Sequence, residues 1–225
     1  MTVETIRCVP IWSGWVRATH WLMAVGVVFQ YVSAQAIAWG ASDYDFWREW
    51  HMIAGELVLL LLVGRVILAF ILPAAASWRA FLPDAVQWQG IKQTLQFYVT
   101  WGRAPLPNWF AHNPLWRLLY PVMFLLILGL GLSGLWYNAP ISVAGLWLHE
   151  WHALFANGLA WLVMGHIIAA IAHDVASKSA SISGMLNGVR YFHIEDKPVH
   201  KPAARNANSK APPVYIAVES IKRKP

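Results

Sequence analysis

The chain has 225 residues, of which 58% are hydrophobic and 12% are charged, and it contains 15 tryptophans. Soluble domains average about 25% charged residues, so this composition excludes an ordinary soluble protein and indicates an integral membrane protein. The single cysteine, Cys8, excludes an internal disulfide, a cysteine-ligated cluster and a CxxCH haem attachment site.

Four apolar segments are each long enough to cross a bilayer, which takes about 20 helical residues. They run roughly over residues 15–39, 47–72, 114–137 and 146–174. Tryptophan and tyrosine lie at their edges, as is typical of membrane interfaces. The sequence therefore predicts an all-α fold, an integral membrane four-helix bundle that occupies residues 1–177.

The basic residues predict the orientation of this bundle. Of the 17 lysines and arginines, only Arg48 lies in the connection between the first two segments, and the connection between the third and fourth has none. The other 16 lie at the opposite ends of the segments, in the middle loop or in the tail. By the positive-inside rule, both termini and the middle loop are cytoplasmic. This distribution also explains the net charge of +6 without nucleic-acid binding.

The middle loop and the tail differ in pattern. Hydrophobic residues recur at helical spacing within residues 84–101, which predicts a short helix at the cytoplasmic interface or packed on the bundle. His112 precedes Asn113 and Pro114, which are typical of a helix start, so we interpret it as a loop residue. Residues 178–225 are polar and basic and predict a flexible cytoplasmic tail close to anionic headgroups.

The third segment contains a GxGxxG pattern at Gly129, Gly131 and Gly134. No strand precedes it, so it does not indicate a dinucleotide site. Small residues in a membrane helix let another helix, or a flat macrocycle, approach closely, and helix packing is the simpler interpretation.

The fourth segment carries four histidines, His149, His152, His166 and His173. Histidines are rare within membrane spans, and each is a candidate functional residue. The 14-residue step from His152 to His166 returns to within about 40° of the same helix face and covers about 21 Å. This spacing of His152 and His166 predicts two sites, one near each side of the membrane.

Counting residues from the segment ends gives each of these histidines a partner. His20 and His166 both lie about 8–12 Å inside from the cytoplasmic edge, and they define the inner level. His51 and His152 lie at similar depths from the opposite edge, and they define the outer level. His149 is an alternative outer ligand at the membrane edge, whereas His173 lies too near the surface for the inner level.

Two histidines at each level restrict the chemistry. Zinc requires three or four protein ligands, which neither level supplies. Haem brings its own four equatorial nitrogens and needs two axial ligands. The sequence thus predicts two bis-histidine b-type haems, His20 with His166 and His51 with His152. The alternative is that the histidines form hydrogen bonds between helices.

Further residues have candidate roles around these levels. Arg17, one turn from His20, and Arg65, 14 residues after His51, suit the propionates of the inner haem or act as snorkelling anchors. Gly55, one turn after His51, would leave room for the outer porphyrin. Glu56 is interpreted as a buried carboxyl, either hydrogen-bonded and neutral or part of a proton relay.

These residues resemble the bacterial di-haem cytochrome b561 family, and more closely the cytochrome b subunits of nickel–iron hydrogenases and related periplasmic oxidoreductases. The resemblance rests on THW at His20, H-x3-G-x9-R from His51 to Arg65, HNP before the third segment and WHALFANGLAWLVMGH in the fourth. It covers residues 12–174 and implies four helices in the bacterial inner membrane. It also implies two b haems with His20, His51, His152 and His166 as ligands, whereas His149 is outside the motif.

The resemblance implies a transmembrane electron-transfer subunit of an oxidoreductase rather than a complete enzyme. Electrons would pass between a periplasmic partner, a c-type cytochrome or a hydrogenase-like subunit, and the quinone pool. Two alternatives remain open at this point. One is a free-standing b561-type quinol or superoxide oxidoreductase, and the other is a non-haem metal or proton transporter lined by histidines.

Overall fold

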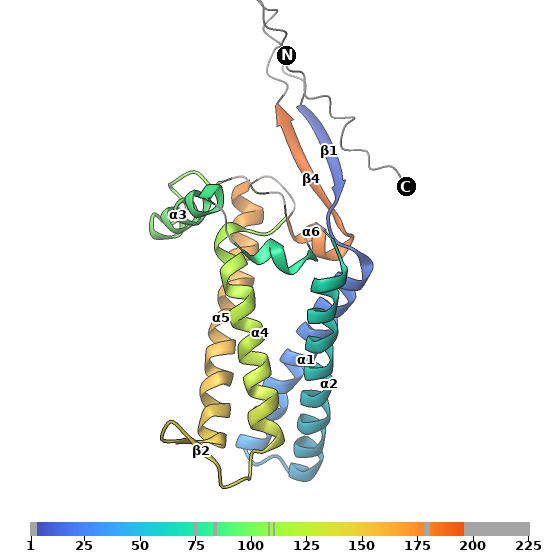
Figure 1. The fold of residues 1–225 in the computed structure, drawn as a ribbon, viewed down its shortest axis with the longest axis vertical. Helices are drawn as coiled ribbons and strands as arrows, with labels where there is room; N and C mark the ends of the chain where they lie inside the picture. Colours follow the sequence, from blue (N-terminus) through green and yellow to red (C-terminus); the bar gives the residue numbers. More distant parts are fainter. Residues whose placement is uncertain are drawn as a thin grey trace, which may run out of the picture.

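The computed structural model describes residues 4–73, 76–82, 85–107, 109, 111–177 and 181–195. Within these residues, four helices are long and apolar enough to cross a membrane. They lie side by side along most of the molecule (Figure 1). Their bounds are α1 (Gly14–Ala38), α2 (Tyr44–Ile71), α4 (Pro114–Leu135) and α5 (Leu148–Ser177). The predicted all-α membrane bundle is confirmed, and each span lies within a few residues of its expected position.

Capping side chains explain where two of these helices begin. The Ser13 hydroxyl accepts a hydrogen bond from the backbone N–H of Val16 at the start of α1 (3.4 Å). The Asn113 Oδ1 accepts from the N–H groups of Leu115 (2.9 Å) and Trp116 (3.4 Å), and Pro114 occupies the first turn of α4. Both residues satisfy donors that have no partner within the helix, and proline lacks one such donor. The helix start predicted at Asn113–Pro114 is confirmed.

The bundle consists of two helical hairpins. The backbones of α1 and α2 approach closely, as do those of α4 and α5, and the two hairpins meet mainly through α2 and α4. By contrast, α5 makes little close backbone contact with either α1 or α2. The buried core lies between the hairpins near the middle of the bundle and comprises Met23, Val27, Val58, Leu62, Ile127 and Leu159. The helices that carry the paired histidines are therefore held apart.

Two glycines of α4 permit the close packing of its neighbours. A Cβ atom at Gly129 would lie 2.7 Å from a ring carbon of Phe155 in α5. A Cβ atom at Gly131 would lie 2.9 Å from a methyl carbon of Leu59 in α2. In a bilayer, helices associate through such close contacts rather than through exclusion of water. The GxGxxG pattern therefore serves helix packing at these two positions.

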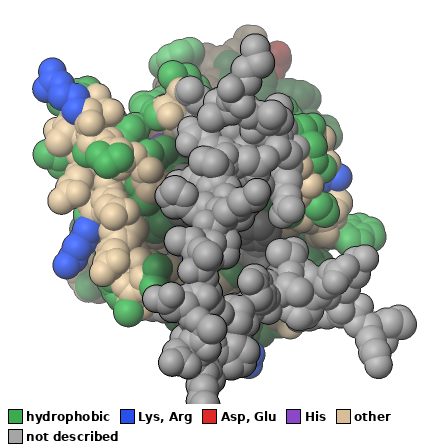
Figure 2. Space-filling view, turned by 90° about the horizontal axis from the view of Figure 1, so that it is seen from above, with side chains coloured by type: hydrophobic (Ala, Val, Ile, Leu, Met, Phe, Trp, Pro, Cys, Tyr) green, Lys and Arg blue, Asp and Glu red, His purple; other side chains and the backbone are tan. Residues whose placement is uncertain are grey.

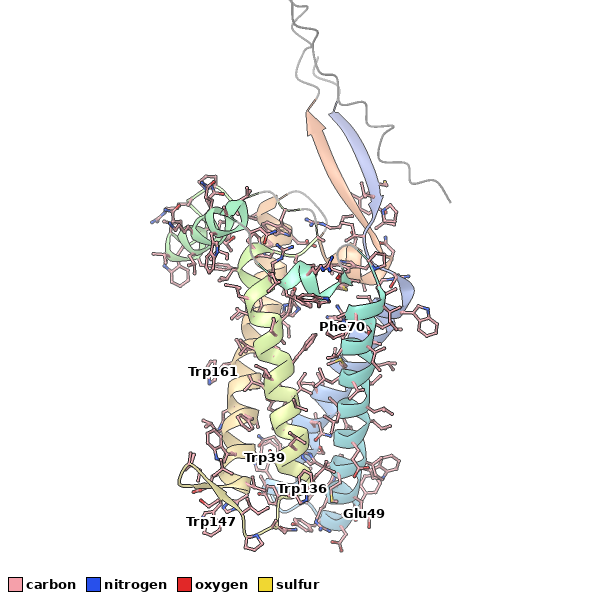
Figure 3. The ribbon with its side chains drawn as sticks, viewed as in Figure 1. Trp39, Glu49, Phe70, Trp136, Trp147 and Trp161 are labelled. Atoms are coloured by element: carbon pink, nitrogen blue, oxygen red, sulfur yellow. The ribbon has the colours of Figure 1, made fainter. Side chains whose placement is uncertain are left out.

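The outer surface of the bundle is apolar, as lipid contact requires. Trp161, in the middle of α5, is 78% exposed, and Phe70, near the C-terminal end of α2, is 69% exposed. Trp39, Trp136 and Trp147 are also exposed and lie near the end of the bundle that carries Glu49 (Figure 3). This arrangement matches an interfacial band of tryptophan around a lipid-facing surface.

Short elements cover the two ends of the bundle. At the outer end, β2 (Ser142–Val143) pairs with β3 (Leu146–Trp147) in the turn between α4 and α5. The inner end carries η2 (Trp78–Phe81), α3 (Ala85–Val99) and α6 (Ser181–Leu186) (Figure 1). The α3 helix corresponds closely to the one predicted over residues 84–101. Seen from this end, Lys and Arg side chains lie at the periphery among hydrophobic ones (Figure 2).

A two-stranded ribbon projects from the inner end (Figure 1). Strand β1 (Glu4–Pro10) pairs antiparallel with β4 (Val189–Glu195), in a register from Glu4 opposite Glu195 to Pro10 opposite Val189. The two ends of the described chain therefore lie on the same side, in agreement with the predicted shared location of the termini. The sequence indicated a flexible tail from residue 178, but the structure contains α6 and β4 within residues 181–195. Residues 178–180 and 196–225 of that tail lie outside the described part.

We expect Gly129→Ala to destabilise the protein by about 1–3 kcal/mol, because the added methyl group overpacks the contact with Phe155. The matched control is Gly64→Ala in α2, where a Cβ atom would have no neighbour within 4 Å. That variant should keep or raise the unfolding temperature, because alanine is the better helix former. Thermal unfolding in detergent measures both; equal unfolding temperatures for the two variants would contradict the packing role of Gly129.

Candidate functional site

The structure brings the predicted histidine pairs together at both levels. At the outer level, His51 of α2 and His152 of α5 have ring centres 6.4 Å apart and ring planes inclined by 63°. At the inner level, His20 of α1 and His166 of α5 have ring centres 6.5 Å apart and an inclination of 62°. Two pairs on different helices thus share nearly the same geometry.

This separation tests what the rings can hold. Imidazoles hydrogen-bonded to each other would have centres about 5 Å apart, so the observed spacing is too large for a direct bond. An imidazole nitrogen binds a metal ion at about 2.0–2.1 Å and lies about 1.1 Å from its ring centre, so two imidazoles on opposite sides of one ion have centres about 6.2–6.4 Å apart. The observed spacings of 6.4 and 6.5 Å fit two axial ligands of one ion.

The ligand count favours haem over a bare metal ion. Among the described residues, no group of three or more His, Cys, Asp or Glu side chains could hold a metal. A group bound between only two imidazoles must bring its own equatorial ligands, as the iron of haem does. The residues present at both levels therefore fit a b-type haem.

Aromatic rings and one arginine surround the inner pair. The His166 ring contacts the rings of Trp116 (5.1 Å between centres) and Tyr120 (6.0 Å) in α4. Arg65 of α2 is only 7% exposed. Among the described residues, the buried Arg65 Nη1 and His20 Nδ1 atoms have no hydrogen-bond partner. A buried guanidinium without an anion is costly, and a haem propionate would supply one.

Arg17 has a partner in the protein. Its Nη1 donates a hydrogen bond to the backbone carbonyl of Leu186 in α6 (2.8 Å). A Cβ atom at Gly188 would lie 3.3 Å from the Arg17 Nε, so the arginine also packs on the turn before β4. Among the described residues both arginines keep a buried donor without a partner, the Arg17 Nε and the Arg65 Nη1. They differ in that Arg65 is buried and has no hydrogen bond to the protein there, whereas Arg17 is half-buried and bonded to α6.

Gly55 lies beside a glutamine of the neighbouring helix. A Cβ atom at Gly55 would lie 3.3 Å from the Gln30 Nε2, which donates to the backbone carbonyl of His51 (2.8 Å). Because Gly55 has no side chain, Gln30 of α1 can approach α2 closely enough to form this hydrogen bond. This contact is a packing reason for glycine here, next to the predicted role of leaving space for a porphyrin.

The remaining histidines lie away from the two pairs. His149 is exposed, and its ring contacts Tyr137 (6.1 Å) rather than facing His51. His173 is 3% exposed; its Nε2 lies 2.9 Å from the Tyr98 hydroxyl, and its Nδ1 lies 3.2 Å from the Asn113 Nδ2. It therefore joins α3, α4 and α5 at the inner end. Neither ring replaces a member of the two pairs.

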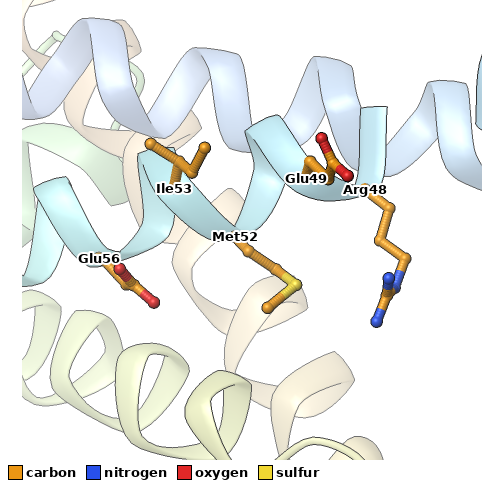
Figure 4. A pocket seen from close by; sticks show the side chains of 5 residues that line it. All are labelled: Arg48, Glu49, Met52, Ile53 and Glu56. Atoms are coloured by element: carbon orange, nitrogen blue, oxygen red, sulfur yellow. The ribbon is translucent and has the colours of Figure 1, made fainter. Parts of the chain in front are cut away.

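The interpretation of Glu56 as a buried carboxyl is wrong. Glu56 is exposed on the surface of α2. With Arg48, Glu49, Met52 and Ile53 it lines a shallow depression on the surface, in which Met52 and Glu56 project from the same side of the helix (Figure 4). A step of about 140° from His51 turns the side chain out of the bundle.

Sequence reasoning missed two serines. Ser33 of α1 lies within 2.8 Å of the His51 Nδ1, and Ser133 of α4 lies within 3.1 Å of the His152 Nδ1. Both contacts join different helices, so no local spacing in the sequence indicates them. A search for polar residues at the depth of the outer histidines would have found both.

A four-helix membrane bundle with histidine pairs of this geometry defines a class of protein, the membrane-bound cytochromes of the b type. A model of the family described as prokaryotic cytochrome b561 matches residues 11–188, most of the chain. The chain belongs to this family. It is accordingly a b-type, haem-binding electron-transfer protein of the membrane.

Curated relatives agree with this assignment. A probable Ni/Fe-hydrogenase B-type cytochrome subunit of Bradyrhizobium diazoefficiens is 26% identical over 82% of this chain and 86% of its own length. Similar proteins with the same type of name occur in Escherichia coli K12 (24% identical, 78% of this chain, 87% of the relative) and Cupriavidus necator (23% identical, 84% and 89%). No solved structure matches the chain significantly.

The loop histidine that precedes α4 makes stability sensitive to acid. The His112 ring lies against Trp12, Phe81 and Tyr120. Burial, with the positive charges of Arg117 and Arg65, lowers the pKa of His112 from 6.5 to about 3.

In the unfolded chain His112 takes up a proton near pH 6.5, whereas in the folded protein it stays neutral down to about pH 3. The unfolded state then binds more protons, so stability falls as the pH drops below 6.5, by about 1.4 kcal/mol between pH 7.5 and 5.5. We expect His112→Phe to reduce the loss of unfolding temperature between these two pH values. An unchanged pH dependence would contradict a buried neutral His112.

Proposed function

We propose that this protein conducts electrons across the bacterial inner membrane, between a periplasmic redox partner and the quinone pool. The observation that carries the proposal is the repetition of one histidine geometry at two levels of α5, with ring centres 6.4 and 6.5 Å apart. The step of 14 residues between His152 and His166 separates the levels by about 21 Å along the helix. Two one-electron sites at these depths would replace one long electron-transfer step across the membrane with shorter steps.

Each proposed residue has a defined task. His51 and His152 would ligate an outer haem b, and His20 and His166 an inner haem b. Arg65 would neutralise a propionate of the inner haem, and Gly55 would leave space beside the outer one. Haem bound between the histidines supplies reversible one-electron transfer at the iron. The chain itself orients the ligands, excludes water and keeps the helices apart.

The partners follow from the ends of the bundle and from the relatives. Curated relatives are named as B-type cytochrome subunits of Ni/Fe-hydrogenases, which supports a hydrogenase-like partner at the outer end. A c-type cytochrome as the partner rests on the family resemblance. The quinone site at the inner end rests on the family resemblance. The distribution of basic residues supports the orientation with the termini in the cytoplasm.

Haem content tests the proposed ligands. We expect purified wild-type protein to bind two haems b per chain and His152→Ala to retain one, because His51 alone does not hold the outer haem. The matched control is His149→Ala, three residues away and outside the pair, which should retain both. Reduced-minus-oxidised spectra with a haem-to-protein ratio measure this. Loss of a haem in the control, with none lost in His152→Ala, would assign the outer ligand to His149 instead.

Electron transfer across a sealed membrane tests the function itself. The protein is reconstituted into lipid vesicles that enclose ferricyanide, and a membrane-impermeant reductant is added outside. We expect the wild type to reduce the enclosed ferricyanide, and His152→Ala and His166→Ala each to lower the rate at least tenfold, because the path needs both levels. Wild-type rates in either variant, or ion movement without electron transfer, would contradict the proposal.

A further inference from the structure

Two buried serines from different helices contact the two outer histidines. Ser33 of α1 is fully buried, and Ser133 of α4 is 3% exposed. The Ser33 Oγ lies 2.8 Å from the His51 Nδ1, and the Ser133 Oγ lies 3.1 Å from the His152 Nδ1. Each outer imidazole is thus held by a hydroxyl on the helix that adjoins its own.

Backbone carbonyls of its own helix can accept the proton of each hydroxyl. The Ser33 Oγ lies 2.8 Å from the carbonyl oxygen of Phe29, and the Ser133 Oγ lies 2.6 Å from that of Gly129. A carbonyl only accepts, and a hydroxyl has a single proton, so a hydroxyl that donates to the backbone has no proton left for the imidazole. The same oxygen can then only accept from the imidazole. We assign the Nδ1 of His51 and of His152 as the protonated nitrogen.

This assignment determines the nitrogen that is available to iron. A neutral imidazole with its proton on Nδ1 has its lone pair on Nε2. A hydrogen bond from the Nδ1–H to an acceptor also makes the ring a stronger electron donor to a bound metal. Stronger donation stabilises ferric over ferrous iron and therefore lowers the reduction potential.

The inner level differs in both respects. The buried His20 Nδ1 has no hydrogen-bond partner among the described residues, so no acceptor strengthens this ligand. The inner level also has the buried guanidinium of Arg65, 14 residues after His51 on the same helix. A nearby positive charge favours the reduced state of a site. Both differences raise the potential of the inner site relative to the outer one.

We propose that Ser33 and Ser133 are positioning residues that hold both outer histidines as Nδ1–H tautomers and make the outer haem the lower-potential haem of the two. The inference rests on the proposed function, because it presupposes a haem at each level. Its consequence is a direction: electrons that enter at the outer level move to the inner level downhill in energy, toward the quinone side.

Redox titration of the purified full-length protein, followed by visible spectroscopy, tests the proposal. We expect two midpoint potentials in the wild type. Ser33→Ala and Ser133→Ala should each raise the lower midpoint and leave the upper one unchanged, and the double variant should raise it further. Ser33→Thr and Ser133→Thr keep the hydroxyl and should keep the lower midpoint near its wild-type value.

The matched control is Thr94→Ala in α3. Thr94 is fully buried and its hydroxyl donates to the carbonyl of Gly90 (2.8 Å), in the same local geometry, but within the described part of the chain it has no hydrogen bond to a histidine. This variant should leave both midpoints unchanged. If an alanine variant loses the outer haem, its threonine counterpart should retain it.

Three results would overturn the inference: a shift of the upper midpoint, no shift with both haems retained, or loss of the outer haem from the threonine variants as well. A wild-type protein without b-type haem bands would instead refute the proposed function. The two failures are therefore distinguishable.

Discussion

Inside a membrane, an imidazole ring must satisfy its polar nitrogens within the protein, because hydrocarbon offers no hydrogen-bonding partner. This constraint acts on four histidines here and explains much of the bundle. The rings face each other in pairs but remain 6.4–6.5 Å apart, and α5 stays away from the backbones of α1 and α2. Among the four spans, close backbone contact lies mainly within the α1–α2 and α4–α5 hairpins and between α2 and α4. Gly129 and Gly131 of α4 allow close approach of α5 and α2 in these contacts.

The two histidine pairs share nearly the same geometry but differ in their surroundings. The outer histidines are bonded to serine hydroxyls, whereas the inner pair lies among aromatic rings near a buried arginine. In a site with fixed axial ligands, hydrogen bonding and charge are the means by which a protein adjusts potential. With a haem at each level, as proposed, a single bundle would give two similar sites different electron affinities, and the order of these affinities would give a direction to transfer.

The sequence alone predicted the four spans and the partner of each histidine, because helical rise converts residue number into depth and only side chains at one depth can meet. It also placed the start of α4 at Asn113. It did not predict the β1–β4 ribbon, whose strands lie at opposite ends of the sequence. Burial of Glu56 was misjudged because its place within an apolar span does not tell which face of the helix meets the other helices. Ser33 and Ser133 were missed because their contacts cross between helices, and Arg17 could not be distinguished from Arg65 without the position of α6.

We propose that each histidine pair supplies both axial ligands of one haem. Low-temperature electron paramagnetic resonance of the oxidised, purified protein distinguishes this ligation from the alternatives. The large angle between the ring planes, 62–63° at both levels, predicts two low-spin ferric signals of high anisotropy. Integration should give two such haems per chain. A dominant high-spin signal from five-coordinate haem, or a single low-spin haem per chain, would contradict the account.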